Sequence, residues 1–149
     1  MNTGMEDLYR EVILDHYRAP RNKGSLEHAD ASCHLHNPLC GDDITLALAV
    51  EGDVIRDARF VGQGCSISQA SASMMTEAIK GKTVAEAREL IDRFSRLMRG
   101  EIAPGEADLG DLEALSGVSR FPVRVKCALL AWEALDKDLA QLTRPAPGG

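Results

Sequence analysis

The feature that most limits the fold of this chain is a pair of alternating apolar stretches on either side of a tight turn. In DITLALAV, residues 43–50, large apolar residues alternate with smaller or polar ones, which is typical of a strand with one buried face. Glu51-Gly52-Asp53 forms a turn signal, and VIRDARFVG, residues 54–62, reads as a second strand. The sequence therefore predicts an antiparallel hairpin that needs a cover on one side.

The rest of the chain supplies that cover, because nearly all of its remaining periodic segments are helical. A short strand is predicted before the hairpin, at residues 32–36. Thr83 and Glu86 form a capping box at the start of the helix predicted over 84–98. Helical patterns run over residues 5–18, 66–80, 84–98 and 123–142, with a short helical piece at 111–117. This order predicts an α+β fold, in which an antiparallel sheet of about three strands is covered by helices.

The length of the chain limits the number of domains, and its charge limits the classes of partner. A chain of 149 residues suits a single domain, which we expect over residues 1–142, followed by a disordered tail at 143–149. The net charge of −6 argues against nucleic-acid and anionic-membrane partners. The first residues lack the pattern of a secretory signal, so we expect a cytoplasmic protein whose thiols stay reduced.

The cysteines are the main candidates for chemistry. Cys40 lies in the polar turn NPLCGDD, where packing does not explain it, and Asp42 follows two residues later. Cys65 opens a predicted helix, where free amides and the helix dipole favour the thiolate. Cys127 lies early in the last helix. Zn²⁺ accepts thiolate sulfur and carboxylate oxygen, so these four residues would form an S₃O ligand set.

The residues alone leave other interpretations open. The cysteines are too far apart for a C-x-x-C pattern, and Cys127 in KCALLAW equally suits a small core residue. Cys33 reads as an ordinary strand residue. His34 and His36 share a strand face, which permits a small metal cluster, but an exposed polar face is the favoured interpretation.

Four separated motifs, in order, give the chain a family resemblance. LYREVILDHYRAPRNKG, HNPLCGDDITL, FVGQGCSISQASASMM and VRVKCALLAW together resemble the U-type family of iron–sulfur cluster assembly proteins. The resemblance implies an IscU/SufE-like sandwich of sheet and helices. It also maps the three functional cysteines of the family onto Cys40, Cys65 and Cys127, and its site aspartate onto Asp42.

Two features favour the SufU branch of that family, which transfers sulfur with the help of zinc. Lys126 stands where IscU-like scaffolds carry a histidine, and residues 97–117 form a stretch that those scaffolds lack. The resemblance then implies a Zn²⁺ cofactor, Cys40 as sulfur acceptor, a pyridoxal-phosphate-dependent SufS-type cysteine desulfurase as partner and a downstream SUF scaffold. The alternative is a scaffold that itself holds iron or a [2Fe–2S] cluster. Arg124 and Lys126 are candidate desulfurase-binding residues, or simply a solvated helix face.

Overall fold

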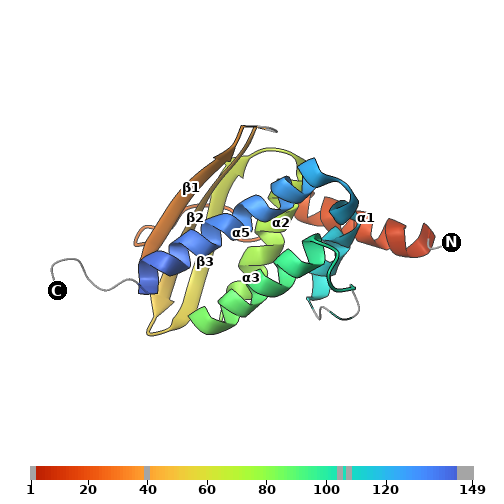
Figure 1. Cartoon of the computed structure of the whole chain (residues 1–149). Coiled ribbons are helices and arrows are strands. Elements are labelled where there is room, and N and C mark those ends of the chain that lie inside the picture. Colours follow the sequence, from red (N-terminus) through yellow and green to blue (C-terminus); the bar gives the residue numbers. More distant parts are fainter. Residues whose placement is uncertain (1–2, 39–40, 104–105, 107–108, 144–149) are drawn as a thin grey trace.

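The computed structural model describes residues 3–38, 41–103, 106 and 109–143. Its elements in chain order are α1 (Thr3–Arg18), β1 (Ala31–Asn37), β2 (Asp42–Glu51), β3 (Val54–Gln63), α2 (Ser66–Ile79), α3 (Val84–Met98), the 3₁₀ helix η1 (Gly110–Arg120) and α5 (Pro122–Thr143). The three strands form one antiparallel sheet in the order β1-β2-β3. In Figure 1, α5 and α2 cross one face of this sheet, with α3, η1 and α1 beyond them. The predicted α+β class is confirmed.

The predicted hairpin forms with β2 as the central strand. Leu46 pairs with Cys33 of β1 on one side and with Phe60 of β3 on the other. The inward side chains of β2, such as Ile44 and Leu46, are fully buried against the helices. The alternation read from the sequence therefore sets which side chains of each strand meet the helices and which meet solvent.

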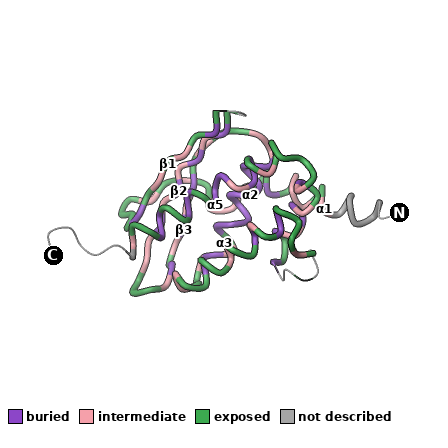
Figure 2. Tube along the Cα trace, in the orientation of Figure 1, coloured by how far each residue is buried: buried purple, intermediate pink, exposed green. Residues whose placement is uncertain are grey.

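Helix α2 lies in the middle of the core and is buried along most of its length (Figure 2). Its small side chains let neighbouring helices approach. The Ser71 hydroxyl makes two hydrogen bonds to residues of α5. The hydroxyl of Ser71 donates to the carbonyl of Ala128 at 2.6 Å and accepts from the indole N–H of Trp132 at 3.1 Å. Trp132 also stacks on Phe94 with ring centroids 4.6 Å apart, so two of the few aromatic residues join α3 to α5.

The helical predictions hold, and the ends of α1, α2 and α5 differ from the predicted ones by one or two residues. The capping box is present, since the Glu86 amide donates to Thr83 Oγ1 and the Thr83 amide donates to Glu86 Oε1. The short helical piece is a 3₁₀ helix that runs on to Arg120, longer than predicted. The first strand also extends by one residue at each end. Residues 144–149 lie outside the described part, so the disordered tail stays a prediction, as does the domain boundary.

A buried histidine fastens α1 to the core. His16 is 1% exposed, and its Nδ1 lies 2.8 Å from Ser73 Oγ while its Nε2 lies 3.3 Å from Asp111 Oδ2. Ser73 Oγ also accepts the backbone N–H of Arg21. One imidazole therefore connects α1, α2 and η1.

Among the described residues, no helix is both long and apolar enough to cross a lipid bilayer.

Asp138 is the buried polar group that the fold accommodates least well. Its side chain is fully buried in α5, and neither carboxyl oxygen has a hydrogen-bond partner among the described residues. Desolvation by burial raises the pKa of Asp138 to about 7. The folded chain therefore holds this proton at a pH where the unfolded chain has lost it, and ionisation of Asp138 opposes folding.

We predict that Asp138→Asn reduces the pH dependence of stability. In the parent protein the contribution of Asp138 falls as pH rises from its unfolded pKa towards about 7, a loss on the order of 2–4 kcal/mol. The variant should lose less stability than the parent between about pH 5 and pH 8 in urea unfolding. Asp136→Asn, at an exposed position of the same helix, is the matched control. An unchanged pH slope in Asp138→Asn would contradict this account.

Candidate metal centre

The first residue of β2 turns a carboxylate into the interior. Asp42 is fully buried, and its Oδ1 accepts the backbone N–H of Cys65 at 2.8 Å. Its Oδ2 lies 3.7 Å from Cys65 Sγ. Strand alternation places Asp42 on the helix-covered face, and antiparallel pairing brings the end of β3, and hence the start of α2, beside it.

Two glycines make this close approach feasible. A Cβ on Gly64 would overlap Oδ1 of Asp42, and a Cβ on Gly62 would overlap the carbonyl oxygen of Asp43. Both glycines also have positive φ, a region that other residues rarely adopt. The glycines before Cys65 are therefore explained by the contact between the β3–α2 connection and the first residues of β2.

Cys65 and Cys127 meet this carboxylate from two helices. Cys65 is the N-cap of α2 with extended backbone geometry, and its side chain makes no capping hydrogen bond. Cys127 reaches the same place from the second turn of α5 and is 3% exposed. One ligand atom each from Asp42, Cys65 and Cys127 lie within 4.8 Å of one another, the one such group of three found in the described part of the chain.

The separations suit a zinc ion. Zinc–sulfur and zinc–oxygen bonds of about 2.3 and 2.1 Å place neighbouring ligand atoms about 3.6 Å apart in a tetrahedron. The 3.7 Å between Cys65 Sγ and Asp42 Oδ2 agrees with that value. Two thiols and a carboxylate are also the donor types that zinc accepts. Cys40, the fourth predicted ligand, lies outside the described residues, so its place in the set stays a prediction.

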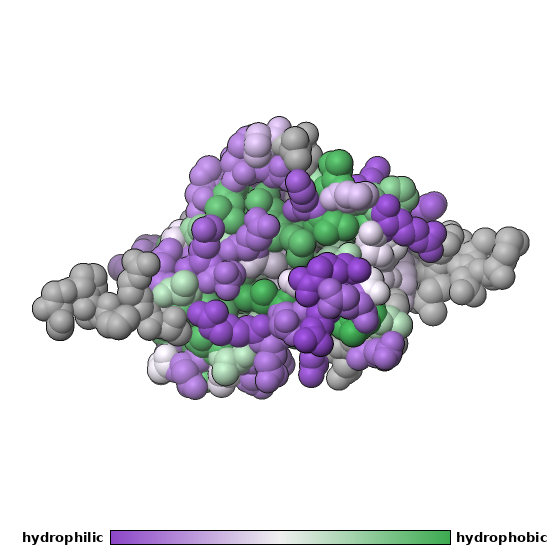
Figure 3. Space-filling view, in the orientation of Figure 1, coloured by the Kyte–Doolittle hydropathy of each residue, from purple (hydrophilic) through white to green (hydrophobic). Residues whose placement is uncertain are grey.

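The candidate partner-binding residues lie beside this centre. Arg124 and Lys126 are exposed on the first turns of α5, and the Arg124 guanidinium lies 6.0 Å from the centre of the Phe121 ring. Phe121 and Val123 are each 54% exposed. Figure 3 shows this apolar surface over the N-terminal half of α5, next to hydrophilic residues. The start of α5 therefore presents both charge and apolar area near the ligands.

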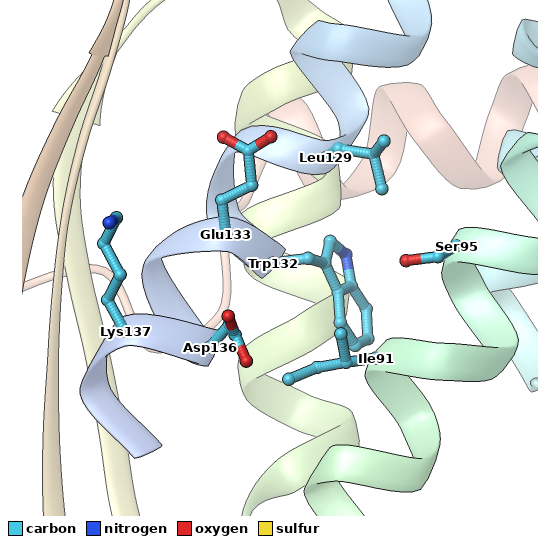
Figure 4. Close-up of a pocket in the computed structure, with 7 residues that line it drawn as sticks. All are labelled: Ile91, Ser95, Leu129, Trp132, Glu133, Asp136 and Lys137. Carbon is cyan, nitrogen blue, oxygen red and sulfur yellow. The ribbon is translucent and has the colours of Figure 1, made fainter. Parts of the chain in front are cut away.

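Cys33 and a cavity between two helices are separate from the centre. Cys33 faces the core side of β1, and burial, assisted by the nearby Asp138, raises the pKa of its thiol. A cavity of about 550 Å³ lies between α3 and α5 (Figure 4). Its described lining holds no cysteine or histidine: Ile91, Ser95, Leu129, Trp132, Glu133, Asp136 and Lys137. Among the described residues, the two thiols that come together with a carboxylate therefore lie on the Asp42 side of α5.

We predict that Asp42→Asn weakens zinc binding by more than the roughly 10- to 100-fold that is usual when a residue supporting a ligand is lost, while the fold is kept. The amide oxygen can still accept the Cys65 N–H, but the charged oxygen ligand is gone. Asp42→Ala should weaken zinc binding and also lower the melting temperature, because that N–H loses its acceptor. Competition with a chromophoric chelator measures the affinity. Asp53→Asn, in the exposed β2–β3 turn, is the control; parental affinity in Asp42→Asn would remove Asp42 from the ligand set.

A family model and several curated proteins match this chain. The model of the NifU-like N-terminal domain matches residues 8–141. The zinc-dependent sulfurtransferase SufU of Bacillus subtilis is 51% identical over 140 residues, covering 94% of this chain and 95% of that protein. The iron–sulfur cluster assembly scaffold protein IscU of Streptococcus pyogenes is 45% identical, covering 88% of this chain and 82% of its own length.

Solved structures also share the fold of this chain. A SUF-system iron–sulfur cluster assembly scaffold protein from Fervidobacterium islandicum superposes with a TM-score of 0.81 at 38% identity, covering 87% of this chain and 94% of that one. The N-terminal part of a NifU-like protein from Brucella abortus gives a TM-score of 0.85 at 27% identity, covering 95% and 98% of the two chains.

Proposed function

Because the chain belongs to the family of NifU-like N-terminal domains, we propose that it accepts persulfide sulfur from a SufS-type cysteine desulfurase. One of its named relatives is a zinc-dependent sulfurtransferase, and another is an iron–sulfur cluster assembly scaffold protein. The acceptor in this proposal is Cys40, and the sulfur passes on to a downstream SUF scaffold in the cytoplasm. The observation that carries the proposal is the convergence of Asp42, Cys65 and Cys127.

In this proposal, Asp42 and Cys127 support the centre, whereas Cys40 reacts. Asp42 and Cys127 are buried and belong to regular elements, so they hold fixed positions. Bound zinc would keep the thiolates deprotonated at neutral pH. Cys40 lies outside the described residues, between β1 and β2 in the sequence; the next residue, Gly41, donates its amide N–H to the Asn37 carbonyl at 2.8 Å. The proposed acceptor is therefore two residues from Asp42 along the chain.

The proposed transfer is a thiol–disulfide type of exchange and needs no external oxidant or reductant. The Cys40 thiolate attacks the outer sulfur of the persulfide on the desulfurase. The sulfur–sulfur bond of that persulfide breaks, a new sulfur–sulfur bond forms on Cys40, and the desulfurase cysteine leaves as a thiolate. The same exchange in the next step would pass the sulfur to the downstream scaffold.

We predict that this chain raises desulfurase turnover and that the transferred sulfur is found on Cys40. Incubation with the desulfurase and cysteine, followed by peptide mass spectrometry, should locate one added sulfur atom there. Cys40→Ser should abolish both the adduct and the stimulation, because serine forms no persulfide. Cys33→Ser, remote from the centre, is the control. Sulfur that arrives on Cys65 or Cys127 instead would overturn the assignment of Cys40.

A cluster scaffold is the second candidate function. It is favoured by the relatives from Streptococcus pyogenes and Thermotoga maritima, which are named as scaffolds. Lys126, in the position before Cys127, argues against it, because a protonated amine has no lone pair to offer iron. Anaerobic reconstitution with iron and sulfide separates the two functions. A scaffold would form a [2Fe–2S] chromophore and transfer it to an apo-ferredoxin.

We also predict that Arg124 and Lys126 contribute to desulfurase binding. Both are exposed near the centre, and charges at the rim of an interface mainly change association. The double variant Arg124→Glu/Lys126→Glu should raise the concentration needed for half-maximal stimulation about tenfold, with zinc content unchanged. Arg93→Glu, on the exposed face of α3, is the control. If the parent and the double variant stimulate the desulfurase equally, Arg124 and Lys126 belong to an ordinary solvated helix face and do not contribute to binding.

A further inference from the structure

A second set of metal-binding side chains lies on the uncovered face of the sheet. His34 and His36 are two residues apart in β1, so they point to the same side. In the neighbouring strand, Asp43 pairs directly with His36, and His34 pairs with Thr45. Asp43 therefore lies on the same face as both histidines and can reach each of them.

The carboxylate of Asp43 hydrogen-bonds the imidazole of His34 through one oxygen, and its other oxygen faces the imidazole of His36. His34 Nε2 lies 2.6 Å from Oδ1, and His36 Nδ1 lies 4.0 Å from Oδ2. A tetrahedral shell with bonds of about 2.05 Å would place neighbouring ligand atoms about 3.3 Å apart. The two observed separations lie on either side of that value, and the three ligand atoms do not all lie within 4.8 Å of one another, so the imidazole rings must rotate to bring both nitrogens to one ion.

The surroundings leave room for an ion and its water ligands. The side chains of His34, His36 and Asp43 are 57%, 53% and 34% exposed. Their backbones are fixed by the β1–β2 ladder, which lowers the entropic cost of bringing three ligands together. Two imidazoles with one carboxylate suit zinc and its neighbours cobalt, nickel and copper in the divalent state, and do not suit calcium or magnesium.

We propose that His34, His36 and Asp43 form a second divalent-metal site, which takes zinc or a similar borderline ion with water in the open positions. It is separate from the thiolate centre because Asp42 and Asp43 are consecutive residues of one strand and point to opposite faces of the sheet. The proposal rests on residues 34, 36 and 43 alone. It does not depend on sulfur transfer.

Cobalt titration of the metal-free, reduced full-length chain tests the proposal. Cobalt bound to cysteine shows sulfur-to-metal charge-transfer absorption, whereas cobalt bound to imidazole and carboxylate does not. The parent should bind about two equivalents, and the charge-transfer band should be complete after the first, because thiolates are the stronger ligands. The double variant His34→Ala/His36→Ala should lose the second equivalent and keep the band. His28→Ala, an exposed loop histidine outside the cluster, should keep both.

Imidazole NMR signals give an independent readout with zinc as the probe. The second equivalent of zinc should shift the ring signals of His34 and His36 and leave those of His28 unchanged. Asp43→Asn should weaken this step without altering the first, which also shows that the variant is folded. A parent that binds a single equivalent, or a second equivalent that survives in the double histidine variant, overturns the proposal.

Discussion

The hydrogen bond from the Cys65 amide to the Asp42 carboxylate is the interaction on which the centre depends. A buried carboxylate must be compensated, and here a free amide at the N-terminus of α2 does so. The same contact fixes the end of the sheet against the helix that fills the core. Gly64 is required because any larger residue would occupy the space of this carboxylate. The thiol of Cys65 is thereby held beside Oδ2, so one backbone contact positions two ligands.

Local patterns predicted the strands and helices well, because alternation, capping and turn residues act over short distances. The candidate site was predictable only in part. Asp42 and Cys65 had unusual local settings, a polar turn and a helix start, which single them out in the sequence. Cys127 did not, since a buried cysteine within an apolar helix looks like core. Its partnership with Asp42 depends on how α5 crosses the sheet, and only the family resemblance pointed to it.

Strand register explains why Asp43 was missed as a partner of His34 and His36. The shared face of the two histidines follows from their spacing, but their carboxylate comes from another strand. Which residue of β2 lies opposite depends on the length of the turn between the strands, and a shift of one residue would place Asp42 there instead. Two adjacent aspartates thus serve different faces, Asp42 in a buried thiol environment and Asp43 in an exposed imidazole environment.

The burial of the ligands also indicates the direction from which the centre can be approached. Asp42 and Cys127 are covered by the sheet and by α5, whereas Cys65 is partly exposed. Among the described residues of the centre, the partly exposed Cys65 is therefore the ligand that a macromolecular partner can reach, from the start of α2. Phe121 and Val123 are exposed at the start of α5, with Arg124 next to them. A partner that approaches the centre would bury this apolar area, which gives it a favourable hydrophobic contribution in addition to any attraction between charges.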